Sequence, residues 1–195
     1  MRNRFVIGSA TLLGLLGWQL GSTRAGVSAK DSRSNAAATD ISDAEIQLAL
    51  QKAPAAPVID QALRVVSING EYNVAVGIVR RNKTISSSSG NAIEHSQITE
   101  VYHVVAGTGT LITGGTIVNP KPLEPNSEIV KILVGPGTSG DSIQGGVSRH
   151  VGPGDVVIIP PHTSHWFSEV TSDQIIYLVV RVDPQKLLPA GFKPQ

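Results

Sequence analysis

Short apolar runs with a period of two residues dominate the chain from residue 63 to residue 182. They are rich in Val, Ile, Tyr and Thr, which favour strands, and turn signals such as Asn69-Gly70 separate them. The runs are LRVVSI, YNVAVGIVRR, ITEVYHVVAG, GTLITGG, EIVKILVG, DVVIIP and IIYLVVRV. This succession predicts an all-β sandwich or closed barrel. Residues 114–150, interrupted by Pro and Gly, are less regular. We expect one strand and long loops there, which could form a lid over a cavity.

A helical pattern precedes the strands. Ser42, with Glu45 three residues later, forms a capping box in front of a mostly apolar stretch. We therefore expect a short helix over residues 42–53 that ends before Pro54, because proline interrupts helical hydrogen bonding. Apart from this helix, the pattern contains strands and turns up to the C-terminal tail.

The N-terminal region has the composition of an export signal. Arg2 and Arg4 precede an apolar run at residues 5–20, and small residues follow it. The alternative, an uncleaved membrane anchor, is disfavoured because the run is shorter than the roughly 20 residues that a spanning helix needs. We expect a signal peptide over residues 1–25, with cleavage that could extend to 29, and a flexible tether over 26–41. The mature protein would be periplasmic or secreted, without stable membrane association.

Composition narrows the partners. The 195 residues are 41% hydrophobic, which is enough for one core, and the 16 basic and 15 acidic residues form no block of like charge. Nucleic acid is therefore not an expected partner. The chain has no cysteine, which excludes a disulfide framework and a lipoprotein-type anchor. Packing, alone or together with a bound metal, must stabilise the fold.

Two parts of the predicted barrel contain histidine, glutamate, glycine and proline residues at characteristic spacings. In the first, His95 is followed after four residues by Glu100, and Glu100 after six more by Gly107. In the second, Gly154, the stretch DVVII, Pro160 and His165 follow one another. Their spacing resembles the two sequence motifs of the cupin superfamily.

The resemblance implies a double-stranded β-helix, a jelly-roll barrel, over residues 60–184, followed by a C-terminal tail over 185–195. It also has departures. Ile93 stands where the family places its first histidine, His162 replaces a glycine, and Glu169 replaces an asparagine. Ile93 would either leave an open coordination position or indicate that the metal has been lost.

Alternation along a strand gives the same residues a role. Ile93, His95 and Gln97 share one face, and after a turn at residues 98–99 Glu100 and Tyr102 can point into the same interior. A charged carboxylate there is costly unless it is paired or bound to a cation. With His165 from a later strand, His95 and Glu100 form a candidate ligand set for one divalent Fe, Mn, Ni or Zn ion. The alternative is a polar cluster whose members satisfy one another.

Neighbouring residues have weaker indications. Tyr102 is a candidate proton donor or hydrogen-bond partner of a ligand, or else a packed core aromatic. Ile93, Gln97 and Trp166 are candidates for the substrate pocket, and Gln97 could also add a weak oxygen ligand. His103 and His162 are expected to be exposed.

These features support three hypotheses. The first is a metal-dependent enzyme, of dioxygenase, isomerase or lyase type, that acts on a small organic molecule, with Glu100 and Tyr102 as catalytic residues. The second is a non-catalytic protein that binds a small ligand or a metal. The third, with least support, is a structural module. By analogy with small cupins we also expect a homodimer.

Overall fold

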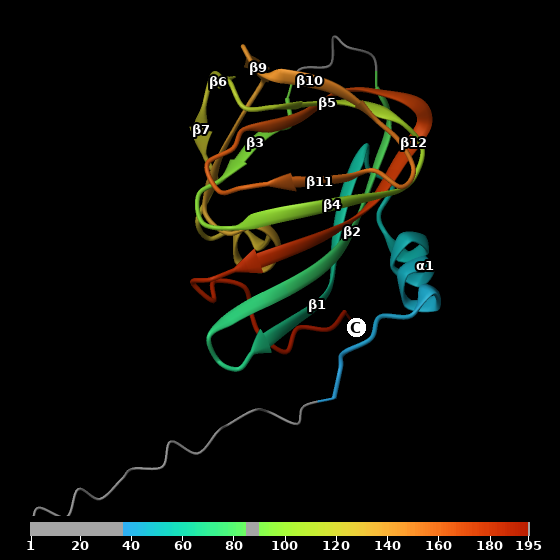
Figure 1. Cartoon of the computed structure of the whole chain (residues 1–195), viewed down its shortest axis with the longest axis vertical. Helices are drawn as coiled ribbons and strands as arrows, with labels where there is room; N and C mark the ends of the chain where they lie inside the picture. Colours follow the sequence, from blue (N-terminus) through green and yellow to red (C-terminus); the bar gives the residue numbers. More distant parts are fainter. Residues whose placement is uncertain (1–36, 85–89, 195) are drawn as a thin grey trace, which may run out of the picture. The chain divides into compact units, whose positions relative to one another are not determined.

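The computed structural model describes residues 37–84 and 90–194 (Figure 1). The predicted signal peptide and most of the tether lie outside this part. Helix α1 (Asp43–Lys52) begins after Ser42, whose hydroxyl accepts a hydrogen bond from the Glu45 backbone N–H, while the Glu45 carboxylate accepts one from the Ser42 N–H. This is the capping box that the sequence pattern indicates. Within the described residues, no helix has the length and apolarity needed to cross a membrane.

The rest of the described chain is mainly antiparallel β-structure, which confirms the all-β prediction. Its elements are β1 (Val58–Ile68), β2 (Tyr72–Thr84), β3 (Ala92–His95), β4 (Thr99–Ala106), β5 (Gly109–Thr113), β6 (Thr116–Val118), β7 (Lys121–Pro122), η1 (Ile129–Val134), β8 (Gly137–Gly140), β9 (Ser142–Gln144), β10 (Val147–Val151), β11 (Val156–Ile159) and β12 (His165–Asp183).

Strand β12 joins the two halves of the barrel. Its first half, from His165 to Val170, pairs with β5 and, at His165, with β3. Its second half, from Gln174 to Asp183, lies between β2 and β4. The register shifts between Val170 and Gln174, where the strand passes from one set of partners to the other. Strands β1, β7, β8, β10 and β11 extend this sheet, while β6 and β9 form a separate two-stranded sheet. The strands curl around a common interior (Figure 1).

The interior is apolar over part of its length and polar at the candidate site. Alternation along β12 turns Tyr177, Val179 and Arg181 inward, and all three are buried. The larger apolar cluster packs residues from both halves of the barrel, including Val104, Leu111 and Ile175. An arginine that continues the inward row of an apolar strand needs charged partners, because an unpaired buried charge is costly.

One predicted strand is wrong. The run EIVKILVG forms η1, a π-helical turn, instead of a strand. Its β-branched composition favours a strand, but Val130 and Val134, four residues apart, are both buried on one side of the turn. Tertiary packing therefore overrides the local preference.

The expectation of one strand and long loops over residues 114–150 is also wrong. This segment contains β6, β7, η1, β8, β9 and β10. Strands β6 and β9 pair with each other, and β7 pairs with β8, which pairs in turn with β3. These strands are two to five residues long, too short for clear alternation in the sequence.

Gly107, directly after β4, is constrained both by its positive φ and by a close backbone contact. Gly70 has only the first of these constraints and therefore serves as a comparison. Gly107 has φ +76°, and a Cβ there would lie 1.9 Å from the Gln174 carbonyl oxygen. Gly70 has φ +73°, but a Cβ there would have no other atom within 4 Å. We predict that Gly70→Ala costs about 1–2 kcal/mol through backbone conformation alone, and that Gly107→Ala costs clearly more or prevents folding. Urea denaturation of both variants checks this, and equal losses would contradict it.

Candidate metal centre

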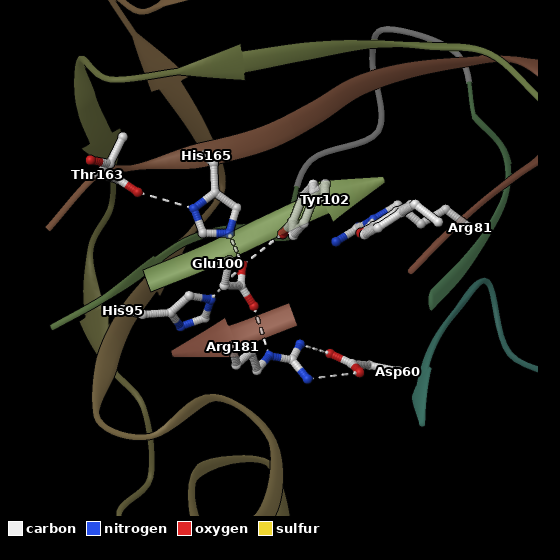
Figure 2. Close-up of polar contacts among 9 residues, drawn as sticks. Asp60, Arg81, His95, Glu100, Tyr102, Thr163, His165 and Arg181 are labelled. Carbon is white, nitrogen blue, oxygen red and sulfur yellow. Dashed lines mark hydrogen bonds and ion pairs between the residues drawn. The ribbon is translucent and has the colours of Figure 1, made fainter. Parts of the chain in front are cut away.

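Three strands bring the candidate ligands together. His95 ends β3, Glu100 lies at the start of β4, and His165 begins β12 (Figure 2). The chain reverses direction between His95 and Glu100, and the His95 carbonyl accepts a hydrogen bond from the His162 backbone N–H at 2.8 Å. Each of the three ligand candidates has at most 4% of its surface exposed, and one ligand atom from each lies within 4.8 Å of the others. The structure thus unites residues that the two sequence motifs supply separately.

The carboxylate of Glu100 is the centre of the group. Its Oε2 atom lies 3.3 Å from His95 Nε2 and 3.4 Å from His165 Nε2, and it accepts a hydrogen bond from the Tyr102 hydroxyl at 2.8 Å. Its Oε1 atom accepts a hydrogen bond from Arg181 Nε at 2.8 Å. One oxygen therefore faces both imidazoles, while the other is held by the guanidinium (Figure 2).

The hydrogen bond behind His165 shows that this donor set fits a metal ion. His165 Nδ1 lies 3.0 Å from the Thr163 carbonyl oxygen, which can only accept, so Nδ1 carries the proton. In the neutral imidazole, Nε2 then has a free lone pair directed toward the negative Oε2 atom of Glu100. Two acceptors in this arrangement require a proton or a cation between them. Two imidazole nitrogens and a carboxylate oxygen are ligands that divalent transition metals prefer, and a backbone partner on the other ring nitrogen is their usual support.

Glu100 is held in its charged form. Burial by itself would raise the pKa of its carboxyl group. The electrostatic influence of His95 and of Arg181, with the contacts to both imidazoles, outweighs burial and holds this pKa well below its usual range. An anionic carboxylate is suited to bind a cation and poorly suited to accept a proton. The structure therefore favours Glu100 as a ligand over the predicted catalytic role.

Arg181 and Asp60 are functional residues that the sequence reasoning missed. Arg181, with 3% of its side chain exposed, bridges Glu100 and Asp60 and contacts the latter through both of its terminal nitrogens. Burial would lower the pKa of Arg181, but the charges of Asp60 and Glu100 raise it above its ordinary value. A signal was present: Arg181 continues the inward alternation of the run IIYLVVRV. In the sheet, Arg181 is directly opposite Glu100.

Tyr102 lies where the alternation of β4 predicts, beside the ligands. Its hydroxyl donates to Glu100 Oε2, and its ring packs on Tyr177 with centroids 4.5 Å apart. Burial and the negative charge of Glu100 raise the pKa of Tyr102 well above its ordinary value. Tyr102 therefore stays protonated near neutral pH and can act as a hydrogen-bond or proton donor.

A cavity of about 640 Å³ lies over the candidate ligands. Its floor is formed by His95, Glu100 and His165, which are buried, and its lining reaches the surface at exposed Lys121 and Ile129. Part of the wall comes from η1 and from β7 and β8, so the irregular segment does shape the cavity. The sequence could not identify these contacts, because they depend on short strands.

Of the three predicted pocket residues, only Ile93 lines the cavity. Gln97 is exposed in the turn after β3 and does not line this cavity. Trp166 does not line this cavity either, because alternation along β12 puts it on the opposite face from His165. There it packs against Ala92 and neighbouring apolar side chains.

His103 and His162 are both exposed, as expected from the sequence. His103 points outward from β4, as alternation predicts. The His162 side chain is 71% exposed and lies 3.2 Å from a Glu94 carboxylate oxygen. Neither joins the ligand cluster.

No protein-family model matches the chain, and no curated protein matches it. Solved structures with a similar fold include the DMSP lyase DddQ from Ruegeria pomeroyi DSS-3, with 16% identity and a TM-score of 0.39 over 64% of this chain. The match spans 46% of that lyase, less than half of its length. An RmlC-like cupin from Methanocaldococcus jannaschii is 13% identical, with a TM-score of 0.39, and covers 68% of this chain and 88% of its own.

A cupin-like protein from Thermotoga maritima is 18% identical, with a TM-score of 0.38 over 68% of this chain and 72% of its own. Such distant likeness speaks to fold alone. The strand order, the two spaced motifs and the His-Glu-His cluster identify the class: the chain has the cupin-type double-stranded β-helix fold, with a buried group of residues that could hold a metal ion.

The buried ion pair gives a stability prediction. We expect Arg181→Leu in metal-free protein to lower the free energy of unfolding by about 3–5 kcal/mol, because it leaves two carboxylates without their partner. Arg64→Leu is the control, since Arg64 pairs with a Glu45 side chain that is 41% exposed, and we expect a much smaller loss. Urea denaturation measures both, and a small effect of Arg181→Leu would show that the pair is not a structural requirement.

Proposed function

We propose that this protein is an exported, metal-dependent cupin enzyme that acts on a small organic molecule. The observation that carries the proposal is the convergence of His95 Nε2, His165 Nε2 and Glu100 Oε2 on the floor of a cavity. The lone pair of His165 Nε2 faces the anionic Oε2 atom of Glu100, and this arrangement is electrostatically unbalanced without a positive species between them. The cavity of about 640 Å³ has the size of a small-ligand site.

A divalent ion bound there would supply Lewis-acid polarisation of a substrate oxygen or support oxygen chemistry. The chain's own residues would perform the remaining tasks. Thr163 fixes the tautomer of His165 through its carbonyl oxygen, and Arg181 keeps Glu100 charged and oriented. Ile93, in place of a further histidine, leaves an apolar surface beside the ligands for the substrate.

Proton transfer is assigned to Tyr102. Its hydroxyl lines the cavity, contacts Glu100 and has a raised pKa, so it can donate a proton to a substrate atom that gains negative charge. Glu100 would serve as the ligand that holds the ion. The reaction could be of dioxygenase, isomerase or lyase type, because a cupin fold hosts each of these.

A second function has one observation in its favour. Both carboxylate oxygens of Glu100 already accept hydrogen bonds, from Arg181 and from Tyr102. A carboxylate whose two oxygens are both engaged is poorly placed to move a proton, which suits a protein that binds a small ligand or a metal without turnover. Metal binding with no turnover of any substrate class would favour this alternative. The expected homodimer stays a prediction.

Stabilisation by added metal can be compared between variants of the candidate ligand histidines and variants of the exposed histidines. Added Zn²⁺, Mn²⁺, Fe²⁺ or Ni²⁺ should stabilise the wild type, by about 2.7 kcal/mol at a hundredfold excess over Kd. His95→Ala and His165→Ala should remove most of this stabilisation, while His103→Ala and His162→Ala, which change exposed residues, should preserve it. Thermal melts with and without each ion measure the difference. If all four variants respond alike, the proposed ligand set is wrong.

Removal of the Tyr102 hydroxyl tests its catalytic role separately from metal binding. Metal-loaded protein is screened with diphenols, diketones and hydroxy acids, by oxygen uptake and by NMR detection of products. For a substrate so found, we predict that Tyr102→Phe lowers kcat by about 10²–10⁴-fold with metal affinity nearly unchanged. Tyr72→Phe, which lies outside the cavity lining, should keep full activity. Unchanged kcat in Tyr102→Phe would exclude the assigned proton donor.

Export is tested on the mature chain. We predict that expression with the complete N-terminal region yields exported protein that begins at residue 26, or at residue 30 if cleavage occurs at the later site. Mass spectrometry of the exported fraction determines the first residue. A chain retained in the cytoplasm with residues 1–25 intact would contradict the proposal.

A further inference from the structure

A second arginine faces the cavity and is not used by the metal centre. Arg81 lies on β2, two residues beyond buried Val79, so alternation turns it toward the interior, and it lines the cavity. Its Nε atom donates a hydrogen bond to the Tyr177 hydroxyl at 3.0 Å, and its guanidinium carbon lies 5.4 Å from the centre of the Phe167 ring. The Phe167 ring contacts the flat face of the guanidinium, and the Tyr177 hydroxyl holds its Nε edge. The group is thereby positioned near the ligand cluster (Figure 2).

Arg81 differs from Arg181 in having no carboxylate that pairs with it in the described part of the chain. Arg181 is held between Glu100 and Asp60. Among residues 37–84 and 90–194, no carboxylate forms an ion pair with Arg81. The adjoining sequence at residues 85–89, ISSSS, contains no acid either. A guanidinium at a cavity wall without a carboxylate partner is a candidate anion site.

Charge balance in the interior strengthens this interpretation. Without a metal, the positive charges of Arg81 and Arg181 equal the negative charges of Asp60 and Glu100. A divalent ion on two neutral imidazoles and Glu100 would leave the group with an excess of two positive charges. Buried excess charge is costly, so a metal-loaded site gains from an anionic occupant.

We infer that Arg81 binds the carboxylate of the substrate, which is therefore a small organic monocarboxylate whose other end reaches the candidate metal centre. This inference rests on the proposed function and names its substrate class. A guanidinium takes the two oxygens of a carboxylate in a fork through parallel N–H donors. One such group, with Asp60 and Glu100 nearby, suits a monoanion better than a phosphate dianion, which several cations would bind better.

The side chains between Arg81 and the ligands define the path of such a molecule. Tyr177 contacts Arg81, its ring packs on Tyr102, and Tyr102 reaches Glu100. The cavity lining also includes Leu133 and Val134 in η1, which are apolar. A carboxylate at Arg81 would thus be followed by carbon atoms between apolar surfaces and by a reacting group near the Tyr102 hydroxyl.

The test compares an anion with its neutral isostere. Propionate and propionamide, lactate and lactamide, and inorganic phosphate are titrated by NMR into Zn²⁺-loaded and metal-free wild type, Arg81→Gln, Arg81→Lys and Arg80→Gln. Arg80 neighbours Arg81 in the sequence but does not line the cavity, so it is the matched control. In wild type, each carboxylate should bind more tightly than its amide and than phosphate.

Arg81→Gln should weaken carboxylate binding by about 10- to 100-fold and leave amide binding nearly unchanged, since hydrogen bonds to a charged partner are lost. Arg81→Lys should lie in between, and Arg80→Gln should match wild type. Equal carboxylate affinity in wild type and Arg81→Gln, or equal affinity of wild type for acid and amide, would overturn the inference even if metal binding stands. Preference for phosphate would overturn the substrate class.

The metal-free arm keeps the two proposals apart. If the protein binds no metal, dependence of propionate affinity on Arg81 in metal-free protein still supports the anion site, while the proposed metal function fails. If a variant does not fold, the comparison of acid and amide on the wild type decides by itself.

Discussion

The ion pair between Glu100 and Arg181 is the interaction on which the candidate site depends. Together with the neighbouring His95, it holds the pKa of a carboxyl group with 1% of its surface exposed well below its usual range, at a place where burial alone would raise this pKa. Because β4 and β12 are paired with these two residues opposite each other, the register of the barrel and the ionisation of the site are coupled. A slip of one residue in either strand would turn that strand's member of the pair outward.

The Glu100–Arg181 pair also determines which polar groups remain available to a metal ion or a ligand. Arg181 occupies one oxygen of Glu100, so the second oxygen is left for the imidazoles and for Tyr102. The charge of Arg181 is used within the cluster formed with Glu100 and Asp60. Arg81, on the cavity wall, is therefore the arginine that remains for a ligand. We propose that the polar interior has two parts, one that would hold a cation and one that would bind an anion.

The candidate ligands could be predicted from the sequence, but the residues that support them could not. Motif spacing and alternation located His95, Glu100 and His165, because these signals are local. Arg181 and Asp60 were missed because their role depends on which distant strands pair. The side of β12 on which Trp166 lies could not be predicted for a similar reason: both faces of β12 are covered, so its pattern does not reveal which one borders the cavity. In EIVKILVG, apolar composition alone could not distinguish a strand from the helical turn of η1.

The central claim is that this interior holds a divalent metal ion through two histidines and one carboxylate. Its most direct test is elemental analysis of the native protein, purified without a histidine tag and without added metal. The account predicts close to one transition-metal ion per chain in wild type and a strongly reduced content in His165→Ala. A wild-type protein that folds stably without a stoichiometric metal, and takes none up from Zn²⁺, Mn²⁺, Fe²⁺ or Ni²⁺, would contradict it.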